Sequence, residues 1–346
     1  MRIGVLTGGG DCPGLNAVIR AIVRTSSHDL GHEIVGFRDG WRGPLDGASE
    51  ALTLDSTRGI LPRGGTILGS SRTNPFRSDD GPERVQRTLS EQQIDGLIVI
   101  GGEDTLGVAN RLSERGVPVV GVPKTIDNDL GGTDMTFGFD TAVQVATDAL
   151  DRLHTTAESH NRTIVVEVMG RHAGWIALHA GLAGGADGIL IPEQPFGLEE
   201  VVEVVERRHR HGRYFSLIVV AEGAVPREGE MATAGADTDQ FGHARLGGIG
   251  LQLERALEQR TGYETRAIVL GHLQRGGTPT AFDRVLATRL GHAAVLGADA
   301  GRWGTMSALR STHIELVDLG ESVRELRRVR PEDLEVASAL LGRAEG

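Results

Sequence analysis

The sequence predicts an α/β protein built on doubly wound, mainly parallel sheets flanked by helices. Short apolar runs rich in Val and Ile recur along the chain, helical patterns separate several of them, and glycine-rich segments follow them. Near-continuous apolar runs are typical of parallel strands that are buried on both faces. Strand, loop, helix and strand at this spacing indicate βαβ units. The length of 346 residues is enough for two lobes that share a cleft.

The expected elements follow this pattern in chain order. Strands are predicted over residues 3–6, 34–37, 96–100, 117–122, 163–168, 188–191, 216–220 and 267–270. Helices are predicted over residues 16–24, 82–92 and 198–210. Residues 223–247 are polar and lack periodicity, so we expect a long surface excursion there. The charged tail after about residue 321 is expected to be helical or loosely docked.

Composition excludes several classes of protein. Hydrophobic residues make up 39% and charged residues 24%, which is typical of a globular protein with an apolar core. No run reaches the about 18–20 apolar residues of a membrane span, and the first residues enter a strand pattern at once. Cys12 is the only cysteine, which excludes a disulfide framework and is typical of a cytoplasmic protein. The net charge of -11 argues against nucleic acid as a partner.

Glycine is the outlier of the composition. The chain has 50 glycines, about twice the usual share of ~7%. They concentrate in TGGGDCPG (7–14), RGGTILGSSR (63–72), GGEDTLG (101–107), MGRHAG (169–174) and GHLQRGG (271–277). Any one of these segments fits a tight βα turn equally well. Together, with interleaved Arg, Asp and Thr, they predict a phosphate site at the carboxyl ends of strands. Neither G-x-x-x-x-G-K-[ST] nor G-x-G-x-x-G fits TGGGDCPG, which argues against a P-loop NTPase and a nicotinamide dehydrogenase.

The densest group of reactive side chains lies in PKTIDND, residues 123–129, directly after a predicted strand. It holds Lys124, Thr125, Asp127 and Asp129. A carboxylate there can take a proton from an attacking hydroxyl, while a second carboxylate and a lysine fix metal and phosphate. In isolation, the segment reads equally as a solvated acidic turn. Two further carboxylates on the preceding loop, Glu103 and Asp104, favour a site in which a cation such as Mg²⁺ offsets their repulsion.

Arginines supply the opposite charge. Apolar strands are flanked by Arg162, Arg171, Arg266 and Arg275, and His272 lies in the last glycine-rich segment. Guanidinium groups bind phosphate bidentately, so several of them together predict a phosphorylated substrate. Each one alone is more often a surface ion-pair residue. The basic run RRHRHGR (207–213) is interpreted as a solvated helix end, with a second anion site as the alternative.

Five segments, in this order, resemble the phosphofructokinase family: GGGDCPGLNAVIR, GGEDT, PKTIDND, VVEVMGRHAGW and ETRAIVLGHLQRGG. The resemblance runs from residue 1 to about 320 and implies two similar lobes, with the chain crossing between them more than once and the active site in their cleft. The phosphoryl-donor lobe is expected to hold residues 1–138 and about 252–305. The fructose 6-phosphate lobe is expected to hold 139–251 and about 306–320, and 321–346 form a C-terminal tail.

The resemblance also implies roles for individual residues. Asp127 matches the base that takes the proton from the 1-hydroxyl of fructose 6-phosphate, with Thr125 and Asp129 beside it at the substrate. Arg171 matches an arginine near the sugar and the transferring phosphoryl group. Met169, Gly170 and Glu222 match residues that bind the sugar. His272 and Arg275 match residues that bind its 6-phosphate. Arg162 and Arg266 match arginines that reach this phosphate from a neighbouring subunit. Gly10, Arg72 and Glu103 match residues that bind the phosphoryl donor, and Glu103 stands at the position of the metal-binding acid. An oligomer, usually a tetramer, is therefore expected to complete the site.

Two departures from the ATP-dependent pattern bear on the donor. Asp104 stands where those members generally have glycine, and Lys124 stands where many of them have glycine. A carboxylate at 104 would meet the inner phosphate of a nucleotide, and like charges about 4 Å apart repel by roughly 4 kcal/mol at an effective dielectric constant of about 20. Pyrophosphate escapes that clash, and Lys124 offers it a cation. The pair resembles the pyrophosphate-dependent members, in a reaction expected to run in both directions.

Two alternatives stay open at this point. One is the same fold using ATP as the donor, because some ATP-dependent relatives carry a lysine like Lys124. The other is a sugar-phosphate sensor without activity, against which the presence of the base Asp127 argues. Arg20 and Arg24 match basic effector-site positions, but His154 replaces an expected arginine, so we do not predict regulation by nucleotides.

Overall fold

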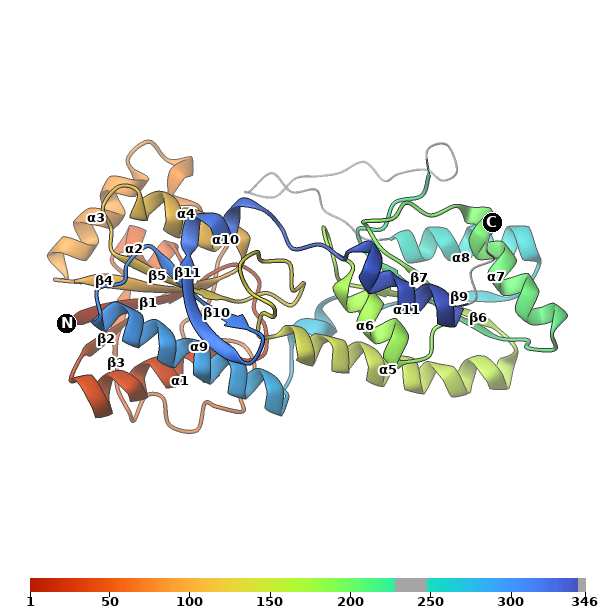
Figure 1. Cartoon of the computed structure of the whole chain (residues 1–346), viewed down its shortest axis with the longest axis horizontal. Helices are drawn as coiled ribbons and strands as arrows, with labels where there is room; N and C mark the ends of the chain where they lie inside the picture. The colour runs from red at the N-terminus through yellow and green to blue at the C-terminus, as the bar shows by residue number, and fades with distance from the viewer. Residues whose placement is uncertain (228–247, 342–346) are drawn as a thin grey trace. The chain divides into compact units, whose positions relative to one another are not determined.

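The computed structural model describes residues 1–227 and 248–341, which form two compact units (Figure 1). The first unit contains residues 1–141 and 275–326, and the second contains residues 142–227, 248–274 and 327–341. The chain passes from one unit to the other after residues 141, 274 and 326, so it crosses more than once, as expected. Most of the predicted excursion, residues 228–247, lies outside the described residues.

The first unit is built on a seven-stranded sheet with the order β11-β10-β5-β4-β1-β2-β3. Its strands are β1 (Arg2–Thr7), β2 (Glu33–Phe37), β3 (Ser49–Leu52), β4 (Gly96–Gly101), β5 (Val119–Pro123), β10 (Thr305–Arg310) and β11 (His313–Asp318). Neighbouring strands from β10 to β2 are parallel, and the two edge strands β3 and β11 are antiparallel. Every residue of β4 and β5 is buried, as expected for parallel strands covered on both faces.

Helices cover both faces of this sheet. They are α1 (Leu15–Thr25), the π-helix η1 (Ser26–Leu30), α2 (Arg42–Asp46), the short 3₁₀ helix η2 (Pro75–Arg77), α3 (Gly81–Glu91), α4 (Glu103–Ser113), α9 (Ala281–Asp299) and α10 (Leu319–Arg324). Figure 1 shows α1 and α9 on one face and α3, α4 and α10 on the other. On the first face, Gly291 of α9 lies so close to α1 that a Cβ there would stand 3.0 Å from the carbonyl oxygen of Val18. The core of the second face includes Phe37, Leu97 and Leu106.

The second unit contains a four-stranded, fully parallel sheet with the order β7-β8-β6-β9. Its strands are β6 (Thr163–Val168), β7 (Gly188–Leu190), β8 (Ser216–Ala221) and β9 (Thr265–Val269). Its helices are α5 (Phe139–His160), which begins in the first unit, α6 (Trp175–Ala183), α7 (Leu198–Arg210), α8 (Ile249–Thr261), the 3₁₀ segment η3 (Gly271–Arg275) and α11 (Pro331–Leu341). Val165, Ile218 and Leu253 belong to the core that α7 and α8 form with the sheet.

The eight predicted strands are confirmed, as are the helices predicted over residues 16–24, 82–92 and 198–210. The predicted lobe boundaries are wrong in two places. Residues 306–320 belong to the first unit, because β10 pairs with the buried strand β5 and β11 closes the edge. Residues 252–274 belong to the second unit, because β9 pairs along its whole length with β6. Strand pairing, which local patterns do not encode, decides both assignments.

The tail beyond residue 321 is divided between the units. Residues up to 326 include the end of α10 and stay in the first unit. Residues 327–341 form a short extended segment and α11 in the second unit. Across residues 1–227 and 248–341, no helix is both long and apolar enough to cross a membrane.

Buried polar groups fasten the start of α9 to the start of α5. Asp283 is fully buried, and its Oδ2 accepts hydrogen bonds from the backbone N and the Oγ1 of Thr141, at 2.8 and 2.5 Å. In return, Thr280 at the N-cap of α9 donates from its Oγ1 to Asp140 and from its backbone N to Thr141. Burial raises the pKa of Asp283 to about 6. These bonds fix the segment that carries Arg275 to the start of the helix that links the two units.

Candidate active site

Two glycine-rich segments meet at the carboxyl end of β1. The backbone N of Gly8 donates to the carbonyl oxygen of Ile100, and that of Gly9 donates to the carbonyl oxygen of Ser71. Ser70 returns a hydrogen bond from its Oγ to the carbonyl oxygen of Gly9, at 2.5 Å. Arg72, which is exposed, follows directly on this segment. The structure therefore carries Arg72 beside the loop that holds Gly10, as the predicted donor site requires.

Lys124 anchors the same loop from β5. It is the only lysine in the chain and is only 3% exposed. Its Nζ donates to the carbonyl oxygen of Gly10 at 2.6 Å, and its backbone N donates to the carbonyl oxygen of Gly101 at 2.9 Å. Burial lowers the pKa of Lys124, while the nearby charges of Asp11 and Asp127 act in the opposite direction. An ammonium group therefore lies among carbonyl and carboxylate oxygens beneath the glycine loop.

Arg275 also lies against Gly10. A Cβ on Gly10 would stand 2.5 Å from its Nη1, so a larger residue at position 10 would displace the guanidinium. The same Nη1 donates to the carbonyl oxygen of Asp11 at 3.3 Å. Arg275 was predicted beside the 6-phosphate of the sugar. The structure places its guanidinium on the predicted donor loop instead, within the first unit.

Two carboxylates open α4. Glu103 and Asp104 occupy its first turn after the N-cap Gly102, where the positive end of the helix dipole stabilises negative charge. A Cβ on Gly102 would lie 3.3 Å from the carbonyl oxygen of Lys124. This close approach sets the start of α4 directly beside the segment PKTIDND.

Side-chain bonds hold the segment PKTIDND in a tight turn. The backbone N of Asp127 donates to Thr125 Oγ1 at 3.1 Å. Asn128 adopts a left-handed conformation (φ 52°), and its Oδ1 accepts from the backbone N of Thr136. Thr136 Oγ1 in turn donates to the carbonyl oxygen of Thr125 at 2.7 Å. The turn presents Asp127 half-buried and Asp129 buried.

The carboxylates interact electrostatically. Burial, and then the charge of Asp127, raises the pKa of Asp129 to about 7, and the charge of Glu103 adds to the effect. Three of the four predicted carboxylates are therefore close enough to repel one another. A proton or a bound cation would relieve that repulsion.

The described residues hold no cluster of three or more His, Cys, Asp or Glu side chains that would bind a metal unaided. Such a cluster is not required for Mg²⁺, which is usually held by one or two carboxylates together with substrate phosphates and water. The oxygen donors at Glu103 and the repulsion felt by Asp129 fit a magnesium ion that binds with a phosphorylated substrate.

The second unit gathers a separate group at the carboxyl ends of β6 and β8. Met169, Gly170 and Arg171 follow β6, and Glu222 follows β8. The backbone N of Glu222 donates to the carbonyl oxygen of Val168 at 2.8 Å, and Gly170 has a φ of 138° that favours glycine. The three predicted sugar-binding residues Met169, Gly170 and Glu222 are therefore neighbours of Arg171.

Sequence reasoning missed Gln274, which ties His272 to this group. The Gln274 side chain is fully buried; its Oε1 accepts from the backbone N of Met169 at 3.3 Å, and its Nε2 donates to the carbonyl oxygen of Gly271. His272, exposed, lies in the segment so fixed. The only signal in the sequence is the amide between the histidine and the arginine of GHLQRGG.

Arg162 and Arg266 lie elsewhere in the second unit. Both form ion pairs with Glu264, at 2.9 and 2.6 Å, beside the first residues of β6 and β9. Those strand ends stand about 20 Å, the length of six strand residues, from the group around Gly170. Within one chain the two arginines do not join the other predicted sugar-binding residues.

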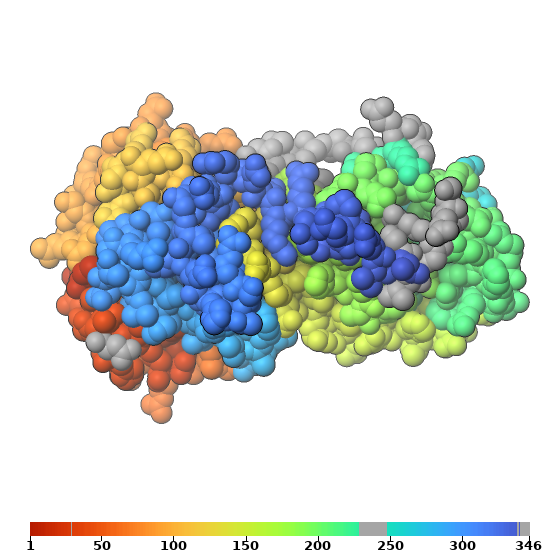
Figure 2. Space-filling view, viewed as in Figure 1, coloured from red at the N-terminus to blue at the C-terminus, as the bar shows by residue number. Residues whose placement is uncertain are grey.

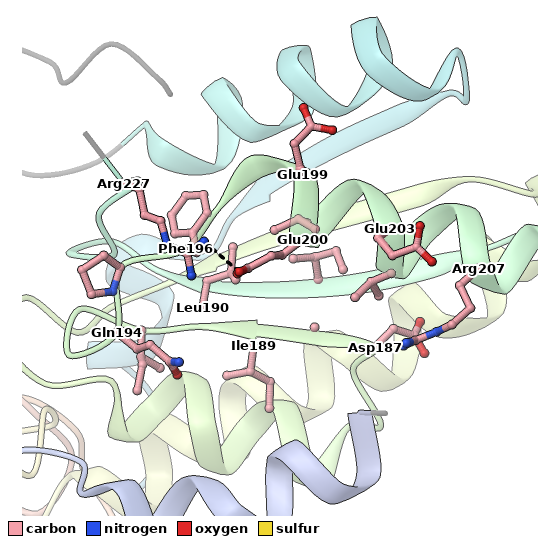
Figure 3. Close-up of a pocket in the computed structure, with 16 residues that line it drawn as sticks. Asp187, Ile189, Leu190, Gln194, Phe196, Glu199, Glu200, Glu203, Arg207 and Arg227 are labelled. Atoms are coloured by element: carbon pink, nitrogen blue, oxygen red, sulfur yellow. Dashed lines mark ion pairs between the residues drawn. The ribbon is translucent and has the colours of Figure 1, made fainter. Parts of the chain in front are cut away.

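A separate cavity of about 430 Å³ lies between α7 and β7 (Figure 3). Its lining includes Ile189, Leu190 and Phe196, and Glu200 at its rim pairs with Arg227 at 2.7 Å. Asp187 at the far end pairs with Arg208 of the basic run, at 2.7 Å. None of the predicted substrate residues lines this cavity.

Comparison with known proteins decides the family. The family model described as Phosphofructokinase matches residues 2–298. The chain belongs to the phosphofructokinase family. The resemblance found in the sequence is thereby confirmed.

Relatives of this chain are named for different donors. A protein of Amycolatopsis methanolica named pyrophosphate–fructose 6-phosphate 1-phosphotransferase is 62% identical, over 99% of this chain and 100% of its own length. A Streptomyces coelicolor protein named ATP-dependent 6-phosphofructokinase 3 is 56% identical, over 95% of this chain and 96% of its own length. The solved phosphofructokinase of Saccharomyces cerevisiae is 34% identical with a TM-score of 0.81, over 98% of this chain, which spans 46% of the yeast chain.

Replacement of Lys124 tests the anchored loop. In Lys124→Met an apolar side chain of similar length fills the buried space, so the fold is retained while the cation and its bond to Gly10 are lost. We expect kcat to fall about 100-fold, as when one preorganised electrostatic group is removed from an active site. Steady-state kinetics with pyrophosphate and fructose 6-phosphate measure this loss; an unchanged kcat in folded Lys124→Met would contradict the assignment.

Proposed function

We propose that the protein transfers a phosphoryl group from pyrophosphate to the 1-hydroxyl of fructose 6-phosphate, reversibly, giving fructose 1,6-bisphosphate and phosphate. The observation that carries the donor assignment is Asp104 in the first turn of α4, next to the turn that holds Lys124. Named relatives of both donor types match nearly the whole chain, so family membership alone does not choose between the two donors.

Charge explains the preference for pyrophosphate. The helix N-terminus and Lys124 attract a small, highly charged anion, whereas Asp104 places a carboxylate where the nucleotide of ATP would extend. Two unit charges about 4 Å apart cost roughly 4 kcal/mol at an effective dielectric constant of about 20, which corresponds to about a thousandfold in affinity. Pyrophosphate ends before that position and meets only the attractive groups.

Asp127 is proposed as the general base. Its carboxylate accepts the proton of the 1-hydroxyl while that oxygen forms a bond to phosphorus and the bond from phosphorus to the departing phosphate breaks. Thr125 holds the turn through its bond from the backbone N of Asp127. Burial, and then the charge of Asp127, raises the pKa of the neighbouring Asp129 to about 7.

Positive groups and a metal stabilise the charge of the transferring group. Gly10, Arg72 and Lys124 would bind the donor, and Arg171 would contact the transferring phosphoryl group from the sugar side. Glu103 would hold Mg²⁺, which when bound neutralises charge on the phosphate oxygens. Catalysis of this kind depends on positioning and electrostatics rather than on a covalent intermediate with the protein.

The acceptor would bind to the group at β6 and β8. Met169, Gly170 and Glu222 would contact the sugar, and His272 its 6-phosphate. The guanidinium of Arg275 rests on Gly10 of the donor loop, so Arg275 is not assigned to that phosphate.

A second copy of the chain is proposed to complete the phosphate site. Arg162 and Arg266 lie away from the sugar group of their own chain, at strand ends joined by Glu264. Along β9 and the segment after it, Ile268, Val269 and Leu273 are 38%, 48% and 69% exposed, which is unusual for large apolar side chains. A homo-oligomer, dimer or tetramer, would cover them and bring the two arginines to a neighbouring active site.

We assign the protein to the cytoplasm.

Replacement of Asp104 separates charge from size. Asp104→Asn removes the charge and keeps the volume, while Asp104→Gly removes both. We expect kcat/KM for ATP to rise in the order wild type, Asn, Gly, with at least a 100-fold gain for Gly, measured with fructose 6-phosphate at saturation. If Asp104→Gly, with retained pyrophosphate activity, gains no ATP turnover, Asp104 does not select the donor.

Replacement of Asp127 tests the base. Asp127→Asn keeps the size of the side chain and removes its basicity, so kcat is expected to fall by about three orders of magnitude or more with little change in substrate affinity. Asp134→Asn is the matched control, because Asp134 accepts a bond from the backbone N of Ser311 outside the turn. Near-normal kcat in Asp127→Asn would reject Asp127 as the base.

A further inference from the structure

The loop that carries Arg171 ends at a carboxylate. Gly174 is the N-cap of α6, and its backbone N donates to both carboxylate oxygens of Glu193, each at 3.1 Å. The first N–H groups of a helix have no partner within the helix, so a carboxylate placed there satisfies them and is stabilised by the helix dipole. Glu193 follows β7 and therefore fixes the start of α6 to the edge of the second sheet.

The same carboxylate holds the C-terminal segment. Glu193 Oε1 also accepts from the backbone N of Val329, at 2.9 Å, and Val329 is only 6% exposed. Residues 327–330 thus reach the start of α6 just before α11 begins at Pro331. One side chain connects the loop after β6 with the last part of the described chain.

Trp175 makes a second connection between the same two segments. Its Nε1 donates to the carbonyl oxygen of Arg327 at 3.1 Å, and the guanidinium of Arg327 lies over the indole ring, 4.2 Å from its centroid. The indole is only 4% exposed, so this stacking is largely shielded from water, where cation–π contacts are strongest. In Figure 2 the dark-blue residues of α11 continue this contact over green residues of the same unit.

The other end of the loop is fixed by β8. The backbone N of Gly223 donates to the carbonyl oxygen of Gly170 at 3.1 Å, and a Cβ on Gly223 would clash with the carbonyl oxygen of Arg171. The residues between these two anchors are Arg171, His172 and Ala173. Loss of the anchor at Gly174 would leave this short span fixed at one end only.

We propose that residues 327–330, held by Glu193 and Trp175, form a clamp that positions Arg171 for phosphoryl transfer. Glu193 and Trp175 are then positioning residues, since they act through the loop and not on the substrate. The inference rests on the proposed role of Arg171. A displacement of about 1 Å at a group that contacts the reacting atoms costs up to 100-fold in rate. The C-terminal segment is thus part of the machinery of the sugar side and not a passive tail.

The test compares full-length variants by steady-state kinetics with pyrophosphate and fructose 6-phosphate varied separately. Glu193→Ala removes the hydrogen bonds from the backbone N of Gly174 and of Val329. We expect kcat/KM for fructose 6-phosphate to fall 10- to 100-fold, with KM for pyrophosphate within about twofold of wild type. Glu193→Gln keeps the oxygen that accepts from both Gly174 and Val329, so it is expected to restore most of the loss. Glu203→Ala is the control, because Glu203 pairs with Arg210 on the exposed side of α7, outside the loop and the clamp, and we expect it to leave both kcat/KM values unchanged.

Trp175→Phe serves if Glu193→Ala fails to fold. It keeps an aromatic ring for Arg327 and removes only the bond from Nε1, so a loss of a few-fold with the same sugar-side signature is expected. Wild-type kcat/KM for fructose 6-phosphate in folded Glu193→Ala and in Trp175→Phe, or a KM for pyrophosphate raised as much as the KM for fructose 6-phosphate, would overturn the proposal. Arg171→Ala is measured in parallel: if it retains full activity, the assignment of Arg171 is wrong, whereas its loss beside unaffected clamp variants rejects the clamp alone.

Discussion

The buried bond from Lys124 Nζ to the carbonyl oxygen of Gly10 is the interaction on which the donor side depends. An ammonium group that is almost fully buried is stable only among oxygen partners, and here they come from the glycine loop and from nearby carboxylates. A compact ammonium suits this space, since a planar guanidinium needs room for its fork. The bond joins the loops that follow β1 and β5. The start of α4 packs against the backbone of Lys124, and the turn with Asp127 comes directly after Lys124 in the chain.

Groups of both charges gather along this edge of the first sheet. Lys124 and Arg275 face the glycine loop, while Glu103, Asp127 and Asp129 gather around the turn that follows β5. The cations suit an incoming diphosphate, and the carboxylates suit the removal of a proton and the binding of a cation. On the proposed function, Asp104 adds negative charge where the nucleotide of ATP would extend. The same edge would then attract phosphate and disfavour a nucleotide attached to it.

Local patterns in the sequence predicted the parts of the fold that depend on local physics. The buried parallel strands were recognisable because helices cover them on both faces, so nearly every side chain is apolar. The hairpin β10–β11 was not recognisable in this way, because β11 is an edge strand with alternating burial. The hairpin belongs to the first sheet because β10 pairs with β5. Likewise, no local pattern shows that β9 pairs with β6, which moved residues 252–274 to the second unit.

The site divides in the same way. The carboxylates and Lys124 stand within seven residues of a strand end, and their proximity follows from the chain itself. Gln274 and Glu193 could not be predicted, because each accepts hydrogen bonds from backbone groups that are distant in the sequence. A single Gln or Glu is not part of a recognisable sequence motif.

The most direct test of the donor is the initial rate of the purified wild-type protein with Mg²⁺, fructose 6-phosphate and either pyrophosphate or ATP. Pyrophosphate is predicted to support turnover with a kcat/KM about a thousandfold or more above that of ATP, as the repulsion at Asp104 requires. Efficient turnover with ATP and none with pyrophosphate would contradict the account.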